Sequence, residues 1–253
     1  MRLSVIIPAY NNLDKLLRCL NTLQAHQRGA VEYLVQDDCS LEYDLSELIP
    51  ATLAATERNA QNLGFPGNCN IGAARATGDV LFFVNQDVAA TPEWSAGWDV
   101  ALLAAIGDLS AAIVGARLLY PTGSIQSVGG LFDAKKQPFH RNLGWSNPLH
   151  PDANQRKRVS WVTGAALAVR ADAFWQLGGF DTGYIGGYFE DVELCVKAQL
   201  AGGEVWFEPG CTLVHEVGTT GGNPRFAANA ALFRERWQQV IEPDTMGIYA
   251  RFW

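Results

Sequence analysis

Two acidic segments carry the residue types from which metal and proton-transfer chemistry can be built. Asn85, Gln86 and Asp87 follow an apolar run that ends at Val84. A carboxylate at the carboxyl end of a buried strand is well placed to hold a divalent cation beside a diphosphate. Glu190-Asp191 opens a helical pattern, where a carboxylate can act as the general base of a displacement. The two segments together predict metal-assisted transfer from an activated sugar nucleotide.

Composition predicts an ordinary folded protein and excludes several other classes. Of 253 residues, 48% are apolar and 18% are charged, which argues against disorder. The net charge of −7 gives no basic surface for nucleic acid. The five cysteines are an odd number without CxxC spacing, as expected for reduced thiols in a cytoplasm. No apolar stretch of about 18 residues predicts a membrane span, so we expect a cytoplasmic protein. Peripheral association with the inner face of the cytoplasmic membrane stays open.

The N-terminal half alternates strand and helix patterns. Buried strands are predicted at 3–8, 31–36, 52–57 and 79–84. Leucines from Leu13 to Leu23 recur at helical spacing, a weak helix is expected at 41–49, and the loop at 62–67 leads into a helix that reaches Ala76. Such alternation indicates an α/β fold with a mostly parallel central sheet and helices on both faces. Ligands of such sheets lie at the carboxyl ends of the strands.

The second half is less regular. The patterns predict helices at 92–106, 171–177, 190–200 and 226–240, and strands at 111–120, 159–170, 205–207 and 212–215. Residues 121–158 are expected to form loops and short strands. We interpret 1–253 as a single domain. A Rossmann-like nucleotide-sugar-binding half at about 1–110 is fused to an acceptor-binding and catalytic half at about 111–225, followed by a C-terminal helix within 226–253.

An ordered set of short motifs resembles the inverting glycosyltransferases of family 2, which have the glycosyltransferase-A fold. The matching segments are 5–11, 35–40, 62–72, 78–87, 162–166, 178–181, 189–195, 214–215 and 218–220. Among these enzymes the chain is most similar to the rhamnosyltransferase-like members that build bacterial surface polysaccharides. Two positions depart from the pattern: Asn85-Gln86-Asp87 stands in place of Asp-x-Asp, and Cys39 in place of a usual glycine.

The metal site is predicted around Asp87. Mg²⁺ and Mn²⁺ prefer oxygen ligands and use few protein carboxylates, with diphosphate oxygens and waters completing the shell. The resemblance implies His215 as a second ligand, and an imidazole favours Mn²⁺ somewhat over Mg²⁺. Without the resemblance, Asp87 could equally cap the helix near Pro92, and His215 could simply end a strand.

Two segments are predicted to bind the nucleotide. Asp37 and Asp38 end the second strand, where a nucleoside commonly lies in doubly wound sheets, although two turn-forming aspartates would look the same. The resemblance assigns Asp38 to the N3–H of uracil or thymine. The loop at 62–72 is rich in glycine and asparagine, which lets backbone N–H groups approach a ligand, unless it is a plain connection. The predicted donor-binding residues are Pro8, Ala9, Tyr10, Asn11, Asp37, Asp38, Asn62, Gly64, Gly67, Asn70, Asn85 and Gln86.

The resemblance implies that Asp191 is the catalytic base and that Glu190 orients hydroxyl groups. In an inverting transfer, the acceptor hydroxyl is deprotonated as it attacks the anomeric carbon opposite the leaving nucleotide. Alternatively, these acids merely favour the positive end of a helix. Trp161, Gly164 and Tyr188 are the expected acceptor or sugar contacts, since aromatic faces suit the C–H face of a pyranose.

The predicted activity is transfer of a sugar from a UDP- or dTDP-sugar, dTDP-rhamnose among them, to a hydroxyl of a glycan or lipid-linked glycan. Two alternatives stay open. A nucleotidyltransferase that forms sugar nucleotides would want a glycine-rich and basic loop after the first strand, where Pro8 to Asn12 stand instead. A non-catalytic sugar-nucleotide-binding homologue would need no Asp191. The aromatic C-terminal segment would pack on the catalytic half or in a homodimer.

Overall fold

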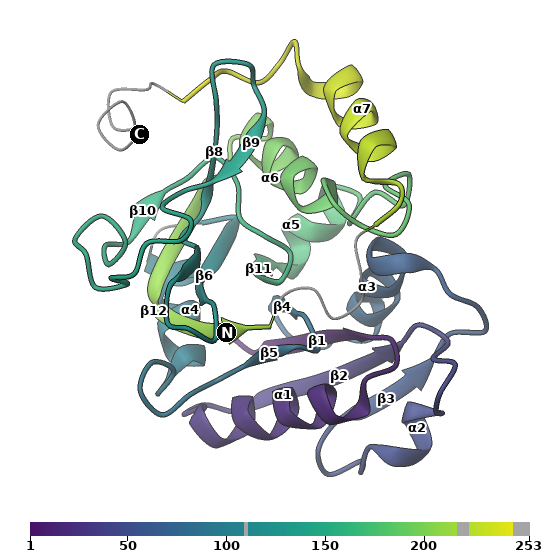
Figure 1. Cartoon of the computed structure of the whole chain (residues 1–253). Coiled ribbons are helices and arrows are strands. Elements are labelled where there is room, and N and C mark those ends of the chain that lie inside the picture. Colours follow the sequence, from purple (N-terminus) through teal and green to yellow (C-terminus); the bar gives the residue numbers. More distant parts are fainter. Residues whose placement is uncertain (109–110, 217–222, 245–253) are drawn as a thin grey trace.

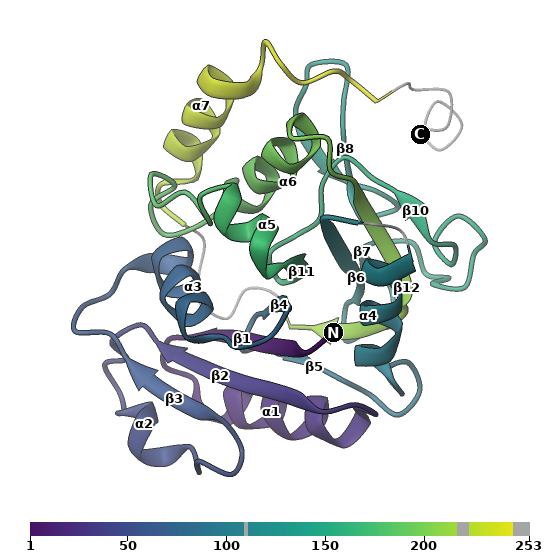
Figure 2. The ribbon, with the colours of Figure 1, turned by 180° about the vertical axis from the view of Figure 1, so that it is seen from behind.

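One continuous sheet organises the chain (Figures 1 and 2). The structure is a computed structural model that describes residues 1–108, 111–216 and 223–244. The ten-stranded sheet has the order β10-β12-β6-β11-β4-β1-β2-β3, with β5 and β7 paired at its side and a separate β8–β9 hairpin. The strands are β1 (Leu3–Ala9), β2 (Val31–Asp37), β3 (Ala55–Arg58), β4 (Val80–Val84), β5 (Val88–Ala89), β6 (Ile113–Leu119), β7 (Ile125–Ser127), β8 (Gly130–Phe132), β9 (Pro138–His140), β10 (Lys157–Arg158), β11 (Ala166–Arg170) and β12 (Val205–His215).

The first four strands of the sheet run parallel. β1 pairs in parallel with β2 and β4, and β2 with β3. In the second half, β11 lies antiparallel between β4 and β6, while β12 returns parallel to β6. The helices are α1 (Leu13–His26), α2 (Leu45–Leu48), α3 (Gly64–Arg75), α4 (Trp98–Asp108), α5 (Ala171–Gln176), α6 (Glu190–Leu200) and α7 (Phe226–Trp237).

Alternating residues of the central strands fill two separate cores. Val5 and Ile7 pack with residues of α1 and α4 on one face. Ile6, between them, packs with residues of α3, α5 and α6 on the other. Successive side chains of a strand point to opposite faces, so a strand that is apolar throughout needs helices on both sides. The predicted sheet with helices on both faces is therefore confirmed.

Four local predictions were wrong. The loop expected at 62–67 is already helical from Gly64, where α3 begins. Residues 159–165 form no strand beyond an isolated bridge at Trp161, and the Gly164 N–H donates to the Asp191 carboxylate. The two strands expected at 205–207 and 212–215 are one strand, whose register shifts between Glu208 and Thr212. The helix expected from Pro92 begins at Trp98, because the preceding residues form turns in which Thr91 N–H bonds the Ser95 hydroxyl.

Within the described ranges, no helix is both long and apolar enough to cross a membrane. The matched segment at 218–220 and the end of the predicted C-terminal segment, 245–253, lie outside the described residues.

Candidate active site

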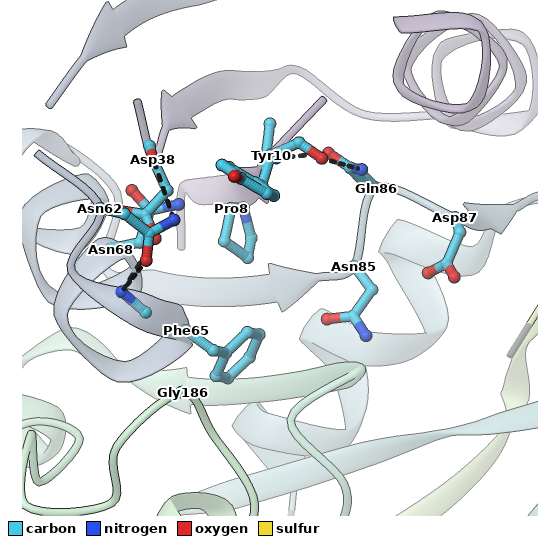
Figure 3. Close-up of a pocket in the computed structure, with 12 residues that line it drawn as sticks. Pro8, Tyr10, Asp38, Asn62, Phe65, Asn68, Asn85, Gln86, Asp87 and Gly186 are labelled. Atoms are coloured by element: carbon cyan, nitrogen blue, oxygen red, sulfur yellow. Dashed lines mark hydrogen bonds between the residues drawn. The ribbon is translucent and has the colours of Figure 1, made fainter. Parts of the chain in front are cut away.

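A cavity of about 250 Å³ opens at the carboxyl ends of β1, β2 and β4 (Figure 3). Parallel strands bring these ends to one edge, so short segments from distant parts of the chain meet there. Asp38, Asn62 and Asn68 lie together on one side, Asn85 and Asp87 on the other, with Pro8 and Tyr10 between them. The lining residues are Pro8, Ala9, Tyr10, Asp38, Asn62, Gly64, Phe65, Asn68, Asn85, Gln86, Asp87 and Gly186.

Asp38 is held by the start of α3. Its Oδ1 accepts the Leu63 N–H at 2.7 Å and its Oδ2 the Gly64 N–H at 2.9 Å, while Asn59 Nδ2 donates to Oδ1 at 3.0 Å. Burial raises the pKa of Asp38, and these hydrogen bonds oppose that rise. Gly64 has a φ of 72°, a conformation that glycine adopts without strain. The loop therefore fixes a carboxylate at this end of the cavity.

Gln86 ties the end of β4 to the end of β1. The Tyr10 N–H donates to Gln86 Oε1 at 2.8 Å, and Gln86 Nε2 donates to the Tyr10 carbonyl at 3.1 Å (Figure 3). Both polar atoms of the amide are thus engaged by backbone. Gln86 lines the cavity, and its bonds hold the wall formed by Pro8, Ala9 and Tyr10.

Asp87 and His215 approach each other at the opposite end. Asp87 Oδ1 lies 3.0 Å from His215 Nε2. Gln126 Nε2 donates to the His215 carbonyl at 3.2 Å, which turns Gln126 Oε1 toward His215 Nδ1 at 2.6 Å. Because an amide oxygen only accepts, Nδ1 must carry the hydrogen, and in a neutral ring Nε2 then presents a lone pair to Asp87. Two acceptors this close need a proton or a cation between them.

This donor set fits a divalent cation. Two ligands at right angles around an octahedral cation ~2.1 Å away lie about 3 Å apart. Within the part of the chain that the structure describes, the buried Oδ1 of Asn85 has no hydrogen-bond partner, and Asn85 Nδ2 lies 3.5 Å from His215 Nε2. The described residues contain no group of three His, Cys, Asp or Glu that could hold a metal, so diphosphate oxygens and waters would complete the shell.

Glu190 and Asp191 begin α6 behind the cavity. Asp191 Oδ2 accepts the Gly164 N–H at 2.8 Å, and Oδ1 accepts the Val192 N–H at 2.8 Å. A Cβ on Gly164 would lie 3.3 Å from the Phe65 ring and 3.4 Å from the Asp191 Cβ. Since Phe65 lines the cavity, Asp191 adjoins the cavity wall beside this ring.

The two carboxyl groups differ in how they are satisfied. Glu190 is buried, and its Oε2 has no hydrogen-bond partner among the described residues. Burial raises the pKa of Glu190 well above its usual range, and the neighbouring Asp191 charge raises it further. Burial also raises the pKa of Asp191, but hydrogen bonds from Gly164 and Val192 favour its ionised form. Of the pair, Glu190 therefore holds a proton more readily, and Asp191 is the better candidate for a free carboxylate.

Four predicted donor residues and His215 lie outside the cavity lining. Asn11 Oδ1 accepts the Leu41 N–H, and the fully buried Asp37 accepts from Ser40 and Arg58. Gly67 is packed against Leu63, and the Asn70 side chain bonds the backbone of Phe180. Asn11, Asp37 and Asn70 hold the surrounding loops through these hydrogen bonds, and Gly67 packs inside α3. A direct contact with the donor stays a prediction for them.

The predicted acceptor residues have different surroundings. Trp161 is only 5% exposed and donates to the Leu131 carbonyl, which is at odds with stacking of its ring on a sugar. Gly164 holds Asp191 through its N–H. Tyr188 is 49% exposed, has a φ of 74°, and makes an edge contact with Phe226. Of the three, only Tyr188 presents a free aromatic surface.

Four residues of this site are not among those predicted from the sequence: Phe65, Asn68, Gly186 and Gln126. Phe65 and Asn68 lie in the glycine- and asparagine-rich segment at 62–72, so that segment's composition was the available signal. Gly186 and Gln126 come from irregular stretches with no periodic pattern, and only the fold brings them to the site.

Comparison with known proteins gives a consistent family. Residues 4–127 match the sequence model of glycosyl transferase family 2. Pre-mycofactocin glycosyltransferase of Mycobacterium tuberculosis is 28% identical over 217 residues, covering 84% of this chain and 42% of that protein. N-acetylglucosaminyl-diphospho-decaprenol L-rhamnosyltransferase of the same organism is 29% identical over 158 residues, covering 58% and 50%. The chain thus spans half or less of the length of these relatives.

The fold is also found among solved structures. A crystal structure of GalNAc-T7 with UDP, GalNAc and Mn²⁺ superposes with a TM-score of 0.74 at 22% identity. The match covers 94% of this chain and 48% of that one. The predicted glycosyltransferase-A fold is therefore confirmed.

Proposed function

Because this chain belongs to glycosyltransferase family 2, we propose that it is a metal-dependent, inverting enzyme that uses a UDP- or dTDP-sugar. The observation that carries this proposal is one cavity with Asp38 at one end and the Asp87–His215 pair at the other. The Asp38 carboxylate can accept a hydrogen bond from a nucleobase that offers an N–H. The Asp87–His215 pair can bind a cation beside the diphosphate. The sugar would then lie near Phe65, beside Asp191.

The reaction is a single displacement at the anomeric carbon. Asp191 accepts the proton of the acceptor hydroxyl, whose oxygen forms the new bond to that carbon. The bond from the carbon to the diphosphate oxygen breaks, and the nucleoside diphosphate leaves with the electron pair. Asp87 and His215 would hold the divalent cation, Mn²⁺ or Mg²⁺, which offsets the negative charge of the leaving group. Glu190, holding its proton, can donate a hydrogen bond to a sugar hydroxyl.

The donor sugar and acceptor are the finer part of the proposal. Similarity to an L-rhamnosyltransferase that acts on a diphospho-decaprenol supports dTDP-rhamnose as one donor and a glycan or lipid-linked glycan as acceptor. Tyr188 is the exposed aromatic residue next to Glu190 and is a candidate to stack on the acceptor sugar. Synthesis of bacterial surface polysaccharide is the process in which such a transfer would serve.

Titration calorimetry of UDP and dTDP, with and without Mn²⁺, tests the site. Wild-type protein should bind at least one of them more tightly with Mn²⁺, and Asp87→Ala should lose that dependence because a ligand oxygen is removed. Asp14→Ala, at an exposed acid of α1, is the matched control. Mn²⁺ dependence that persists in Asp87→Ala would remove Asp87 from the metal site.

Turnover tests the reaction class. We expect nucleoside diphosphate to be released from a UDP- or dTDP-sugar in the presence of a glycan acceptor, with inversion at the anomeric carbon by NMR. Binding without any release across a panel of donors and acceptors would instead favour the non-catalytic homologue. Formation of a sugar nucleotide from a nucleoside triphosphate and a sugar phosphate would favour the nucleotidyltransferase.

A further inference from the structure

Behind Asp38 lies a connected chain of buried amide side chains. Gln36, Asn59 and Asn68 are all less than 8% exposed. Gln36 Nε2 donates to Asn59 Oδ1 at 2.8 Å, and Asn59 Nδ2 donates to Asp38 Oδ1 at 3.0 Å and to Asn68 Oδ1 at 2.8 Å. None of the site predictions made from the sequence includes Gln36, Asn59 or Asn68. Their polar atoms are paired with one another, which is what burial requires.

The direction of this chain is fixed at one end by Arg75. Its Nη1 donates to Gln36 Oε1 at 2.8 Å. A guanidinium has no acceptor, so the Gln36 oxygen must face it and the Gln36 amino group must face Asn59. The Asn59 oxygen then accepts from Gln36, and the Asn59 amino group is left for Asp38. A donor-only group at the end of α3 thus sets the orientation of an amide beside the cavity.

The other end fixes the same direction independently. Asn68 Nδ2 donates to the Gln36 backbone carbonyl at 2.8 Å. Since a carbonyl only accepts, Asn68 must turn its oxygen toward Asn59. Asn59 can satisfy that oxygen only with its amino group. The orientation of Asn59 follows from both ends and does not depend on an arbitrary choice between amide oxygen and nitrogen.

The consequence appears at Asp38. A carboxylate offers about four acceptor positions, and three of them are filled by N–H groups of Asn59, Leu63 and Gly64. Oδ1 accepts two of these bonds and Oδ2 accepts one, so one acceptor position remains on Oδ2. The three described groups that bond the Asp38 carboxylate are all N–H donors. None of them is an acceptor with which Asp38 could share a proton. It therefore meets a ligand as an acceptor.

We propose that Asn59 is a positioning residue for nucleobase specificity, because Gln36 and Arg75 on one side and Asn68 on the other hold its amino group toward Asp38. Asp38 then selects a pyrimidine ring that offers an N–H, as uracil and thymine do at N3, and rejects cytosine, whose N3 is an acceptor. The inference rests on the proposed donor site and adds residues that do not touch the ligand. It predicts that base preference can be changed without altering the cavity wall.

Asn59→Asp is the sharpest variant. It keeps the shape of the side chain but places a second carboxyl group about 3 Å from Asp38, a separation at which two carboxylates share one proton. Asp38 can then donate as well as accept. We expect the ratio of CDP to UDP dissociation constants, measured by calorimetry with Mn²⁺, to fall at least tenfold from its wild-type value. A tenfold change in this ratio corresponds to about 1.4 kcal/mol of discrimination between the two bases.

A matched pair at Arg75 provides the second arm. Arg75→Met removes the donor that orients Gln36, whereas Arg75→Lys keeps a donor-only cation on a stem of similar length. Because Asn68 also orients Asn59, the pair is compared in an Asn68→Leu background. In that background the preference for UDP should fall at least threefold in Arg75→Met and remain within twofold in Arg75→Lys. Gln24→Leu removes an amide of α1 that donates to the Leu53 carbonyl, and it should leave the preference for UDP unchanged.

The outcomes separate this inference from the proposed function. Wild-type protein that binds neither UDP nor dTDP overturns the donor site, and the specificity role with it. Wild-type protein that binds UDP no better than CDP overturns the specificity role alone, as does a UDP preference that is unchanged in Asn59→Asp and in Arg75→Met with Asn68→Leu. A cooperative thermal melt like that of wild type shows that each variant is folded. If Asn59→Asp does not fold, the Arg75→Met and Arg75→Lys pair decides.

Discussion

Two ends of the site, the surroundings of Asp38 and the start of α6 at Glu190, satisfy their polar groups in opposite ways. Around Asp38, every buried amide is paired, and the carboxylate accepts three N–H groups. Around Glu190, a buried carboxyl oxygen has no partner, and the two preceding residues, Tyr188 and Phe189, have φ values of 74° and 79°. A non-glycine residue in that conformation is strained. Cys39, directly after Asp38, also has a positive φ of 63°, so what separates the two regions is hydrogen bonding. The surroundings of Asp38 are fully paired, while the start of α6 carries an unsatisfied carboxyl oxygen.

This difference suggests that the two regions serve different steps, donor binding around Asp38 and turnover at the start of α6. A fully paired network holds its geometry before the ligand arrives, which reduces the cost of binding. An unsatisfied carboxyl group and strained backbone lower stability and persist where the surrounding structure holds them for a function. We therefore expect substitutions near Asp38 to change affinity and base preference, and substitutions at Glu190 or Asp191 to change turnover or stability.

Asp191→Asn should give the largest effect and test the division directly. Loss of a general base typically lowers turnover by ~10²–10⁴-fold, so kcat should fall by at least two orders of magnitude. Donor affinity, measured by calorimetry, should barely move, because Asp191 is bonded to Gly164 and Val192 and is not among the residues that line the cavity. If Asp191 is the general base, wild-type kcat should decline as pH falls through the raised pKa of Asp191, because protonation removes the base.

Asp191 accepts one hydrogen bond on each carboxylate oxygen, from Gly164 and from Val192. An asparagine has a single side-chain oxygen, so Asp191→Asn loses one of these two hydrogen bonds. Thermal melting and UDP binding must therefore accompany the kinetics. Turnover near the wild-type value would exclude Asp191 as the base. A large loss of UDP affinity with kcat preserved at saturation would make it a donor-binding residue and break the division between the two ends.

Gln126→Leu should weaken the cation site by an intermediate amount. Removing a group that orients a metal-bound histidine typically costs ~10–100-fold in metal affinity. We expect Mn²⁺ affinity, measured by counting free Mn²⁺ in electron paramagnetic resonance spectra, to fall within that range. Gln126→Glu retains an acceptor for the Nδ1 hydrogen of His215 and should restore most of the affinity. Equal losses in both variants would show that Gln126 only supports local packing.

The sequence was most informative where a local pattern and a general rule of the fold combine. Asp38, Asn85 and Asp87 each follow an apolar strand, and parallel strands bring their carboxyl ends to one edge. Their meeting at the cavity could be predicted without knowing the pairing of the remaining strands. In the same way, periodicity accounts for the leucines of α1 packing in one core and for successive residues of β1 dividing between two.

Contacts made by irregular segments could not be predicted in this way. Gln126 and His215 are 89 positions apart, and Gln126 lies in a stretch without a clear period. Trp161 was expected to stack on a sugar, but the fold buries it against β8, where its indole N–H bonds a carbonyl. An aromatic residue looks the same in sequence whether it lines a pocket or fills a core. Residue type alone therefore identified candidates but not their exposure.

Glu190→Gln should have the smallest effect and tests the unsatisfied carboxyl group itself. Because burial raises the folded-state pKa of Glu190 above its unfolded value near ~4.3, the folded protein binds more protons between the two values. Wild-type stability must then decrease as pH rises through this window, whereas the amide has no charge to bury. Glu190→Gln should match the wild-type melting temperature near pH 4 and exceed it by about 2–4 °C at pH 8, the shift that ~1 kcal/mol produces in a domain of this size. Glu47→Gln, on the exposed helix α2, is the control and should melt like wild type at both pH values. A melting temperature of Glu190→Gln that is equal to or below the wild-type value at pH 8 would mean that Glu190 is satisfied in solution, and the contrast between the two ends of the site would be lost.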